Sequence, residues 1–204
     1  MASNNGFLDG LIISGKCEVP CQTDPEYAKI SSNQCSWCAA EFATNAKKLI
    51  RLFAEDKNAF KDLYKQCLSQ GSIKRQLNNG TQYGENIDNS GLLGNYQMTN
   101  FKFKTIILNN DPSFVEVLPN DLKEEFYSRI HVKEDNIDDI TGNIYVMVSR
   151  HGQSFTVIPI GDRYLILDSH IHTLGLIDRV GLEKYIKHDH GGHTHVTLIY
   201  GMIH

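Results

Sequence analysis

The sequence lacks three kinds of segment that would assign it to a class at once. No run of eighteen apolar residues occurs in its 204 residues, which argues against a membrane-spanning helix. Residues 1–6 (Met-Ala-Ser-Asn-Asn-Gly) have neither the basic start nor the apolar core of a signal peptide. Its 20 basic residues are fewer than its 24 acidic ones, so no general basic patch for nucleic acid is expected. We therefore expect neither a membrane nor a nucleic acid as a partner.

Cysteine is also scarce, and the number of cysteines is odd. There are five, at positions 17, 21, 35, 38 and 67. Without an export signal, an odd count predicts reduced thiols and an intracellular, cytoplasmic location. With 41% apolar residues, the chain can bury a sizeable core. We expect a monomer with a single domain over residues 1–204, of which 1–16 form an N-terminal extension.

The first half of the chain carries helical patterns. From Ser36 to about Ala54 the apolar residues recur at helical spacing, which predicts the longest helix. A second helix is expected from about Lys57 to Ser69, with Gly71 closing it. A Cys/Pro/Asp-rich loop is expected over 17–33, and a long surface loop over 78–100.

The second half reads as strands. Apolar, alternating segments are expected to form strands over 101–108, 143–150, 154–160, 163–168 and 196–203. Short glycine turns join the middle three, which predicts an antiparallel meander. Helices followed by such a sheet predict an α+β fold with N-terminal helices packed on a C-terminal antiparallel sheet.

Cys35 stands just before the strongest helical pattern. A helix N-terminus stabilises a thiolate through its dipole and N–H groups, and the same groups can bind an oxyanion. A free cysteine is more often a small buried apolar residue. Cys38 competes for the nucleophile's role, but it lies one turn further on and is followed by two alanines, which suits packing. We therefore favour Cys35.

Asp168 and His170 end an apolar strand. Residues two apart on a strand share a face, so the carboxylate could orient the imidazole as a general base. His172 continues that face. A second arrangement stays open: His151 begins a neighbouring strand, and Asp168 could orient it instead. Without a function, Asp168 and His170 would simply be a polar strand end entering a turn, and His151 an exposed hairpin residue.

Gln22 could complete such a site. A tetrahedral oxyanion needs a donor besides the nucleophile's own N–H, and a glutamine amide supplies one. Gln22 precedes Cys35 by thirteen residues. The spacing of papain itself would place the glutamine at position 29, which is a lysine here.

Metal binding is the alternative interpretation of the cysteines. Cys17 and Cys21, followed by Cys35 and Cys38, resemble the ligand spacing of a four-cysteine zinc site in an interaction module. The histidine-rich segment 188–195 could also bind a metal. Because neither cysteine pair has the glycine of a zinc knuckle, we expect no metal and no cofactor.

Together these motifs resemble a known family. Gln22, Cys35 within Asn-Gln-Cys-Ser, and Leu167-Asp-Ser-His170 resemble the deubiquitinating protease at the N-terminus of herpesvirus large tegument proteins, in element order and in the order Gln, Cys, Asp, His. Leu167 departs from the aromatic residue that is common there. The resemblance implies a papain-like cysteine protease fold, with Cys35 as nucleophile, His170 as base, Asp168 orienting it and Gln22 as oxyanion donor.

The implied activity is hydrolysis of the isopeptide bond after the C-terminal glycine of ubiquitin, so ubiquitin or polyubiquitin conjugates would be the partners. The acidic residues between 134 and 139 and the loop over 78–100 would then contact ubiquitin. The alternatives are a papain-like peptidase or acyltransferase with a non-ubiquitin substrate, and the zinc-stabilised module.

Overall fold

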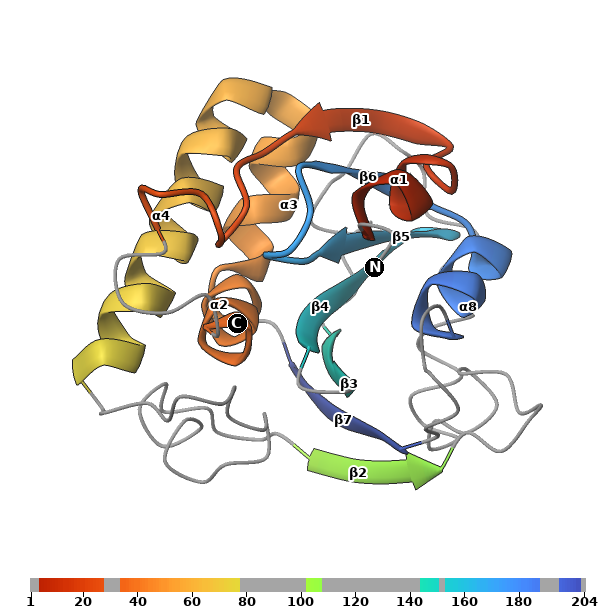
Figure 1. Cartoon of the computed structure of the whole chain (residues 1–204). Helices are drawn as coiled ribbons and strands as arrows, with labels where there is room; N and C mark the ends of the chain where they lie inside the picture. Colours follow the sequence, from red (N-terminus) through yellow and green to blue (C-terminus); the bar gives the residue numbers. More distant parts are fainter. Residues whose placement is uncertain are drawn as a thin grey trace.

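The chain forms a seven-stranded antiparallel sheet with helices on both faces (Figure 1). The computed structural model describes residues 4–27, 34–77, 102–107, 144–150, 153–187 and 195–202. The strand order in the sheet is β1-β6-β5-β4-β3-β7-β2. The strands are β1 (Ser14–Glu18), β2 (Lys102–Ile107), β3 (Ile144–Arg150), β4 (Gln153–Ile160), β5 (Arg163–Leu167), β6 (Thr173–Ile177) and β7 (His195–Met202).

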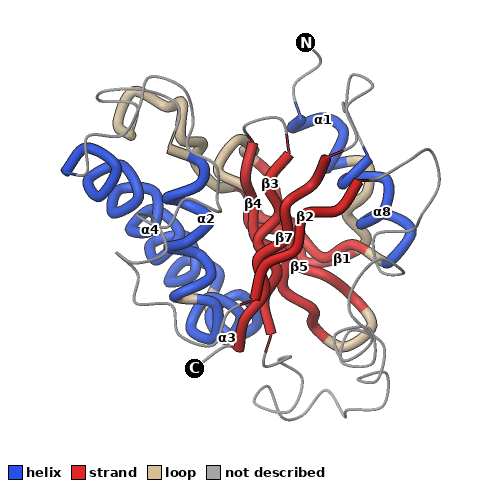
Figure 2. Tube along the Cα trace, turned by 90° about the horizontal axis from the view of Figure 1, so that it is seen from below, coloured by secondary structure: helices blue, strands red, loops and turns tan. Residues whose placement is uncertain are grey.

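The helices form two layers. Figure 2 shows α2, α3 and α4 on one face of the sheet, with α1 and α8 on the opposite face. Their bounds are α1 (Asn4–Asp9), α2 (Cys35–Thr44), α3 (Ala46–Glu55), α4 (Lys57–Leu77) and α8 (Arg179–Lys187). In the described part of the chain, no helix has both the length and the apolar character needed to cross a membrane. The α+β class agrees with the sequence, but the sheet is covered on both faces.

The predicted long helix over 36–54 is two helices that meet at Asn45. Thr44 Oγ1 donates to the carbonyl of Ala40 at 2.8 Å, and Asn45 Nδ2 donates to that of Glu41 at 2.9 Å. Such side chains compete with the backbone ladder and favour a helix end. Nine of the ten residues of α2 are buried, so α2 is the central helix of the fold, whereas α3 buries one face.

Gly71 does not close α4, contrary to the sequence prediction, because the helix continues to Leu77. A Cβ at Gly71 would lie 2.9 Å from both the backbone nitrogen and Sγ of Cys38. The glycine therefore allows α4 to cross close to α2. It is a packing position and not a C-terminal cap.

The N-terminal segment joins the sheet. β1 pairs antiparallel with β6, a strand that the sequence did not predict, and the predicted loop from Cys17 begins only after Glu18. Beyond β1, the Val19 N–H donates to the His172 carbonyl at 2.8 Å. The chain after β1 therefore runs alongside the turn between β5 and β6. The expected loop over 78–100, the acidic residues between 134 and 139, and His151 lie outside the described residues.

Candidate active site

Cys35 is the first residue of α2, as predicted, and is 1% exposed. The residue before it, Gln34, donates through Nε2 to the carbonyls of Tyr27 at 3.1 Å and Gln22 at 3.5 Å. These bonds tie the start of the helix to the loop that carries Gln22. The first turn of a helix presents N–H groups without intrahelical partners, and these can donate to an oxygen that becomes negatively charged beside the sulfur.

Asp168 and His170 are in direct contact. The imidazole Nδ1 lies 2.7 Å from Asp168 Oδ1, and the His170 backbone N–H donates to the same oxygen at 2.9 Å. β5 ends at Leu167, so the two residues belong to a turn and not to the strand. An aspartate that accepts from the N–H two residues later is the usual start of such a turn. The sequence predicted the right pair, but the turn, not strand alternation, brings the side chains together.

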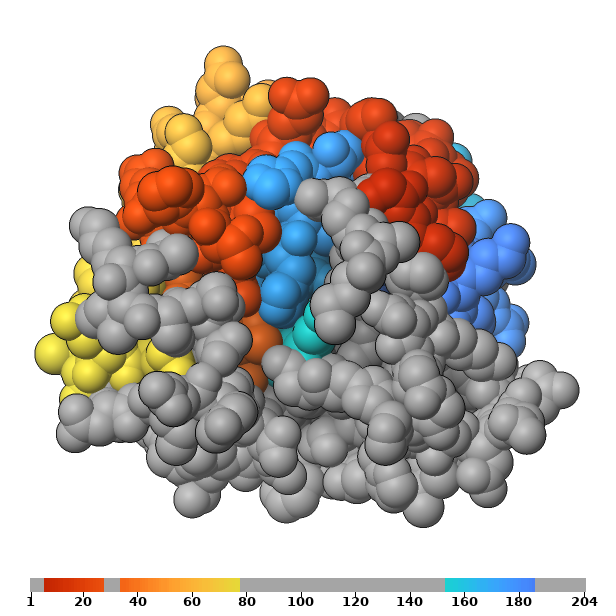
Figure 3. Space-filling view, viewed as in Figure 1, coloured from red at the N-terminus to blue at the C-terminus, as the bar shows by residue number. Residues whose placement is uncertain are grey.

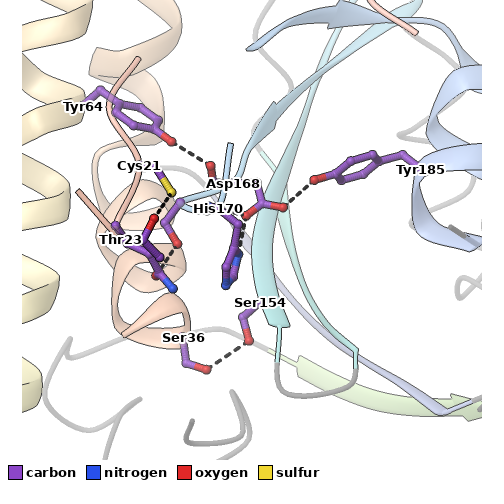
Figure 4. A network of polar contacts seen from close by, with 10 residues as sticks. Cys21, Thr23, Ser36, Tyr64, Ser154, Asp168, His170 and Tyr185 are labelled. Atoms are coloured by element: carbon purple, nitrogen blue, oxygen red, sulfur yellow. Dashed lines mark hydrogen bonds and ion pairs between the residues drawn. The ribbon is translucent and has the colours of Figure 1, made fainter. Parts of the chain in front are cut away.

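Two tyrosines hold Asp168 from opposite sides (Figure 4). The Tyr185 hydroxyl, on α8, donates to Asp168 Oδ2. The Tyr64 hydroxyl, on α4, donates to the Asp168 carbonyl at 2.8 Å. Since α4 and α8 cover opposite faces of the sheet (Figure 2), Asp168 is fixed by both helical layers.

The electrostatic balance keeps Asp168 ionised. Burial alone would raise the pKa of its carboxyl, but the charge of His170 and the hydrogen bonds from His170 and Tyr185 outweigh it and lower that pKa. Burial and the neighbouring Asp168 raise the pKa of Tyr64 well above its ordinary value, so its hydroxyl remains a donor.

His170 links Asp168 to Cys35. Burial alone would lower the pKa of the imidazole, but the charge and hydrogen bond of Asp168, with the hydrogen bond and charge of Cys35, raise it well above its ordinary value. With Nδ1 on Asp168, Nε2 is the ring nitrogen that remains for the thiol. The three side chains therefore form a continuous Cys–His–Asp chain, as a nucleophile, its base and the base's orienting group must.

The site is enclosed but reaches the surface. Asp168 is 1% exposed at its side chain, whereas the His170 side chain is 19% exposed. In the space-filling view, blue atoms from beyond residue 160 come to the surface beside the orange atoms of the N-terminal part (Figure 3). Of these three residues, His170 is therefore the one whose side chain solvent reaches, whereas Cys35 and Asp168 are each 1% exposed.

Gln22 lies at the same turn. Its backbone N–H donates to the Ser169 carbonyl at 2.7 Å, and its Oε1 accepts from the Ser169 hydroxyl, also at 2.7 Å. Gln22 is 1% exposed. The structure thus brings together all four residues selected from the sequence. Cys35, His170 and Asp168 are in direct contact, and Gln22 is joined to them by its bonds to Ser169.

The predicted zinc alternative does not fit this geometry. Cys17, Cys21, Cys35 and Cys38 are all described and buried, yet among the described residues no group of three or more His, Cys, Asp or Glu side chains could hold a metal ion. Cys38 lies at the α2–α4 crossing, and the Cys21 Sγ is hydrogen-bonded to Thr23 Oγ1 at 3.1 Å. Most of the histidine-rich segment, 188–194, lies outside the described residues.

His172 continues beyond the Asp168–His170 turn and is exposed. Its Nε2 lies 3.1 Å from Asp24 Oδ1, on the exposed side of the Gln22 loop. Sequence reasoning missed the roles of Tyr64, Tyr185 and Ser169. The only available signal was general: a buried tyrosine hydroxyl needs a hydrogen-bond partner.

The fold and the site define a class, the papain-like cysteine protease fold: a cysteine at the start of a buried helix meets a histidine and an acid presented by an antiparallel sheet. Comparison with protein-family models finds no match, and comparison with curated protein sequences finds none either.

Solved structures similar to this chain include a viral protease and a bacterial protein. One is the ubiquitin-specific protease encoded by murine cytomegalovirus tegument protein M48, solved in complex with a ubiquitin-based suicide substrate: TM-score 0.53, 12% identity, 91% of this chain and 84% of that chain covered. The other is the Pseudomonas avirulence protein AvrPphB: TM-score 0.50, 11% identity, 96% and 100% covered. At these identities the likeness shows the fold.

Proposed function

We propose that the protein is a cysteine protease that hydrolyses the isopeptide bond after the C-terminal glycine of ubiquitin. The observation that carries the proposal is the contact of His170 with both Asp168 and Cys35, at the N-terminus of a buried helix. The shared fold with a viral ubiquitin-specific protease supports the choice of substrate.

The proposed reaction has two half-reactions. Cys35 Sγ gives its proton to His170 and attacks the glycine carbonyl, so that a tetrahedral oxyanion forms. The Cys35 N–H and the Gln22 amide donate to that oxyanion. His170 then protonates the leaving lysine amine, and the C–N bond breaks to leave a thioester. Water, deprotonated by His170, attacks the thioester and releases the ubiquitin carboxylate and the thiol.

Burial of the thiol supports a glycine at the cleaved position. Cys35 is 1% exposed and its neighbours in α2 are buried as well. An acyl group that reaches such a sulfur must be slim, and glycine has no side chain to exclude. The Gly-Gly end of ubiquitin meets this requirement.

The decisive test is reaction with ubiquitin that carries an electrophile at its C-terminus. Wild type is expected to form a covalent adduct seen by gel shift and mass spectrometry, and Cys35→Ala is expected to form none. Cys67→Ala is the matched control, because Cys67 is an equally buried thiol on α4. An adduct that survives Cys35→Ala contradicts the proposal. No adduct with wild type, in a protein whose Cys35 still reacts with small acyl esters, would favour a peptidase or acyltransferase with another substrate.

A further inference from the structure

Ser169 makes two hydrogen bonds to one residue of the N-terminal loop. Its carbonyl accepts the Gln22 backbone N–H, and its hydroxyl donates to Gln22 Oε1, both at 2.7 Å. Both residues are 1% exposed. The bonds join positions 147 residues apart in sequence. The residue between the acid and the base therefore holds the loop that carries Gln22.

The Cys38 thiol near Ser169 does not compete for the Ser169 proton. Burial raises the pKa of Cys38 well above its ordinary value, so Cys38 remains an uncharged thiol and not a thiolate. An uncharged thiol is a weak acceptor, which leaves the serine proton for Gln22 Oε1. The close crossing at Gly71 fixes the position of Cys38.

The bond from the Ser169 hydroxyl determines which way round the Gln22 carboxamide lies. A carboxamide has an acceptor branch and a donor branch, and rotation by half a turn exchanges them. A bond from Ser169 to Oε1 places Nε2 on the opposite branch. The reverse orientation would present an oxygen to the developing oxyanion and repel it, whereas an N–H stabilises it.

We propose that Ser169 is a positioning residue that fixes the Gln22 amide as an oxyanion donor. The proposal rests on the proposed function, because it needs Cys35 to attack a carbonyl. Asp168 and His170 then serve the proton transfer, and Ser169, between them in the sequence, positions the donor to the oxyanion.

Two reactions of Cys35 separate this role from a general structural one, and neither needs ubiquitin. Iodoacetamide alkylates the sulfur by displacing iodide, without an oxyanion. p-Nitrophenyl acetate acylates it through a tetrahedral oxyanion and releases p-nitrophenolate. Since loss of one oxyanion donor costs about 10²- to 10³-fold, Gln22→Ala is expected to slow acylation by about 100-fold. Ser169→Ala is expected to slow it by about tenfold or more and to change alkylation less than about twofold.

Further variants test whether Ser169 acts through Gln22. The double variant Ser169→Ala/Gln22→Ala is expected to acylate no more slowly than Gln22→Ala alone, because the two act on one donor. Ser169→Thr, which restores a hydroxyl, is expected to recover acylation. The matched control is Thr156→Val, which removes another buried hydroxyl, one that donates to Ala39 at 2.8 Å. It is expected to leave the ratio of the two rates unchanged.

Opposite results overturn the inference. Equal slowing of both reactions by Ser169→Ala would make Ser169 merely structural, and no slowing of acylation would exclude the role. If Ser169→Ala does not fold, Ser169→Cys, which keeps the shape but is a weak donor, provides the same ratio, and an unchanged ratio there contradicts the role. Wild-type Cys35 that reacts with neither reagent would instead refute the proposed function, and with it the inference. Wild type that reacts with both but not with a ubiquitin probe refutes only the choice of ubiquitin.

Discussion

The Tyr185 hydroxyl donates a hydrogen bond to Asp168 Oδ2, whereas His170 contacts the other carboxylate oxygen, Oδ1. Both oxygens of this buried acid are therefore occupied by donors, one from α8 and one from the turn after β5. The tyrosine is a part of the site that lies on the far layer of the fold, away from Cys35.

Removal of this hydroxyl should change the acid limb of the activity profile. In Tyr185→Phe the carboxylate loses one of the groups that lower its pKa, so the acid limb of the rate of Cys35 acylation is expected to move to higher pH. The rate is expected to fall, and stability to decrease by about 1.5–3 kcal/mol, since a buried charge loses a hydrogen bond.

Tyr64→Phe is the matched control. It removes a hydroxyl of the same kind that donates to the backbone carbonyl of Asp168 and not to its carboxylate. Stability is expected to fall by about 1–3 kcal/mol while the acid limb stays in place. If both variants move the limb equally, Tyr185 has no separate electrostatic role.

The choice of base is the second prediction. Because the Asp168 carboxylate contacts His170 and Tyr185, His170→Ala is expected to abolish turnover. His151→Ala is expected to keep turnover within about twofold of the wild-type rate. Turnover of ubiquitin amide derivatives by the two variants decides this. Loss of activity in His151→Ala alone would reverse the assignment and make the observed His170 contact structural.

Stability should depend on pH through the Asp168–His170 pair. The pKa of His170 is raised, so its contribution is full below the unfolded value of about 6.5 and is lost as pH rises through the folded pKa. The pKa of Asp168 is lowered, so its contribution is present above about 3.9 and is lost as pH falls through the folded pKa. The pair therefore stabilises the fold most between about pH 4 and 6.5.

Urea unfolding of wild type and Asp168→Asn measures this effect. The difference in unfolding free energy is expected to be larger at pH 6 than at pH 9.5. Asp24→Asn is the control: Asp24 accepts the Cys21 N–H and faces His172 on the exposed side of the loop, where solvent screens the pair, so its difference is expected to change little between pH 6 and pH 9.5. A constant Asp168→Asn difference from pH 5 to pH 10 would contradict the assigned ionisation.

Gly71→Ala is expected to destabilise the protein although alanine is the better helix former. The added Cβ would lie 2.9 Å from Cys38 backbone, so α2 and α4 must separate. We expect a loss of about 1–3 kcal/mol, measured by thermal or urea unfolding. Gly6→Ala in α1 is the control, because nothing lies within 4 Å of its Cβ, and there alanine is expected to stabilise by up to about 1 kcal/mol. Equal effects of the two changes would show that the crossing is loose.

Local signals predicted much of the site. Cys35 was found from the start of a helical pattern, Asp168 and His170 from the end of an apolar strand, and Gln22 with the help of a family resemblance. Tyr64 and Tyr185 could not be found in this way, because their role depends on which faces of the sheet α4 and α8 cover.

Errors in the fold have similar causes. The break at Asn45 comes from side chains that bond back to carbonyls four residues earlier, which apolar periodicity does not detect. Gly71 matched the composition of a helix end, yet its role is set by a distant helix. β6 was missed because its five residues, Thr173–Ile177, carry little alternation and include a glycine that packs against Ile12.

The site is assembled from segments that are far apart in sequence. Ser169 is hydrogen-bonded to Gln22, 147 residues earlier, and Asp168 to Tyr64, 104 residues earlier. During synthesis the ribosome releases the thiol and the oxyanion loop first. A nascent chain that ends at Tyr164 has neither the acid nor the base, and β5 is only beginning. The enzyme we propose would thus be inactive until the chain beyond His170 is made and folded.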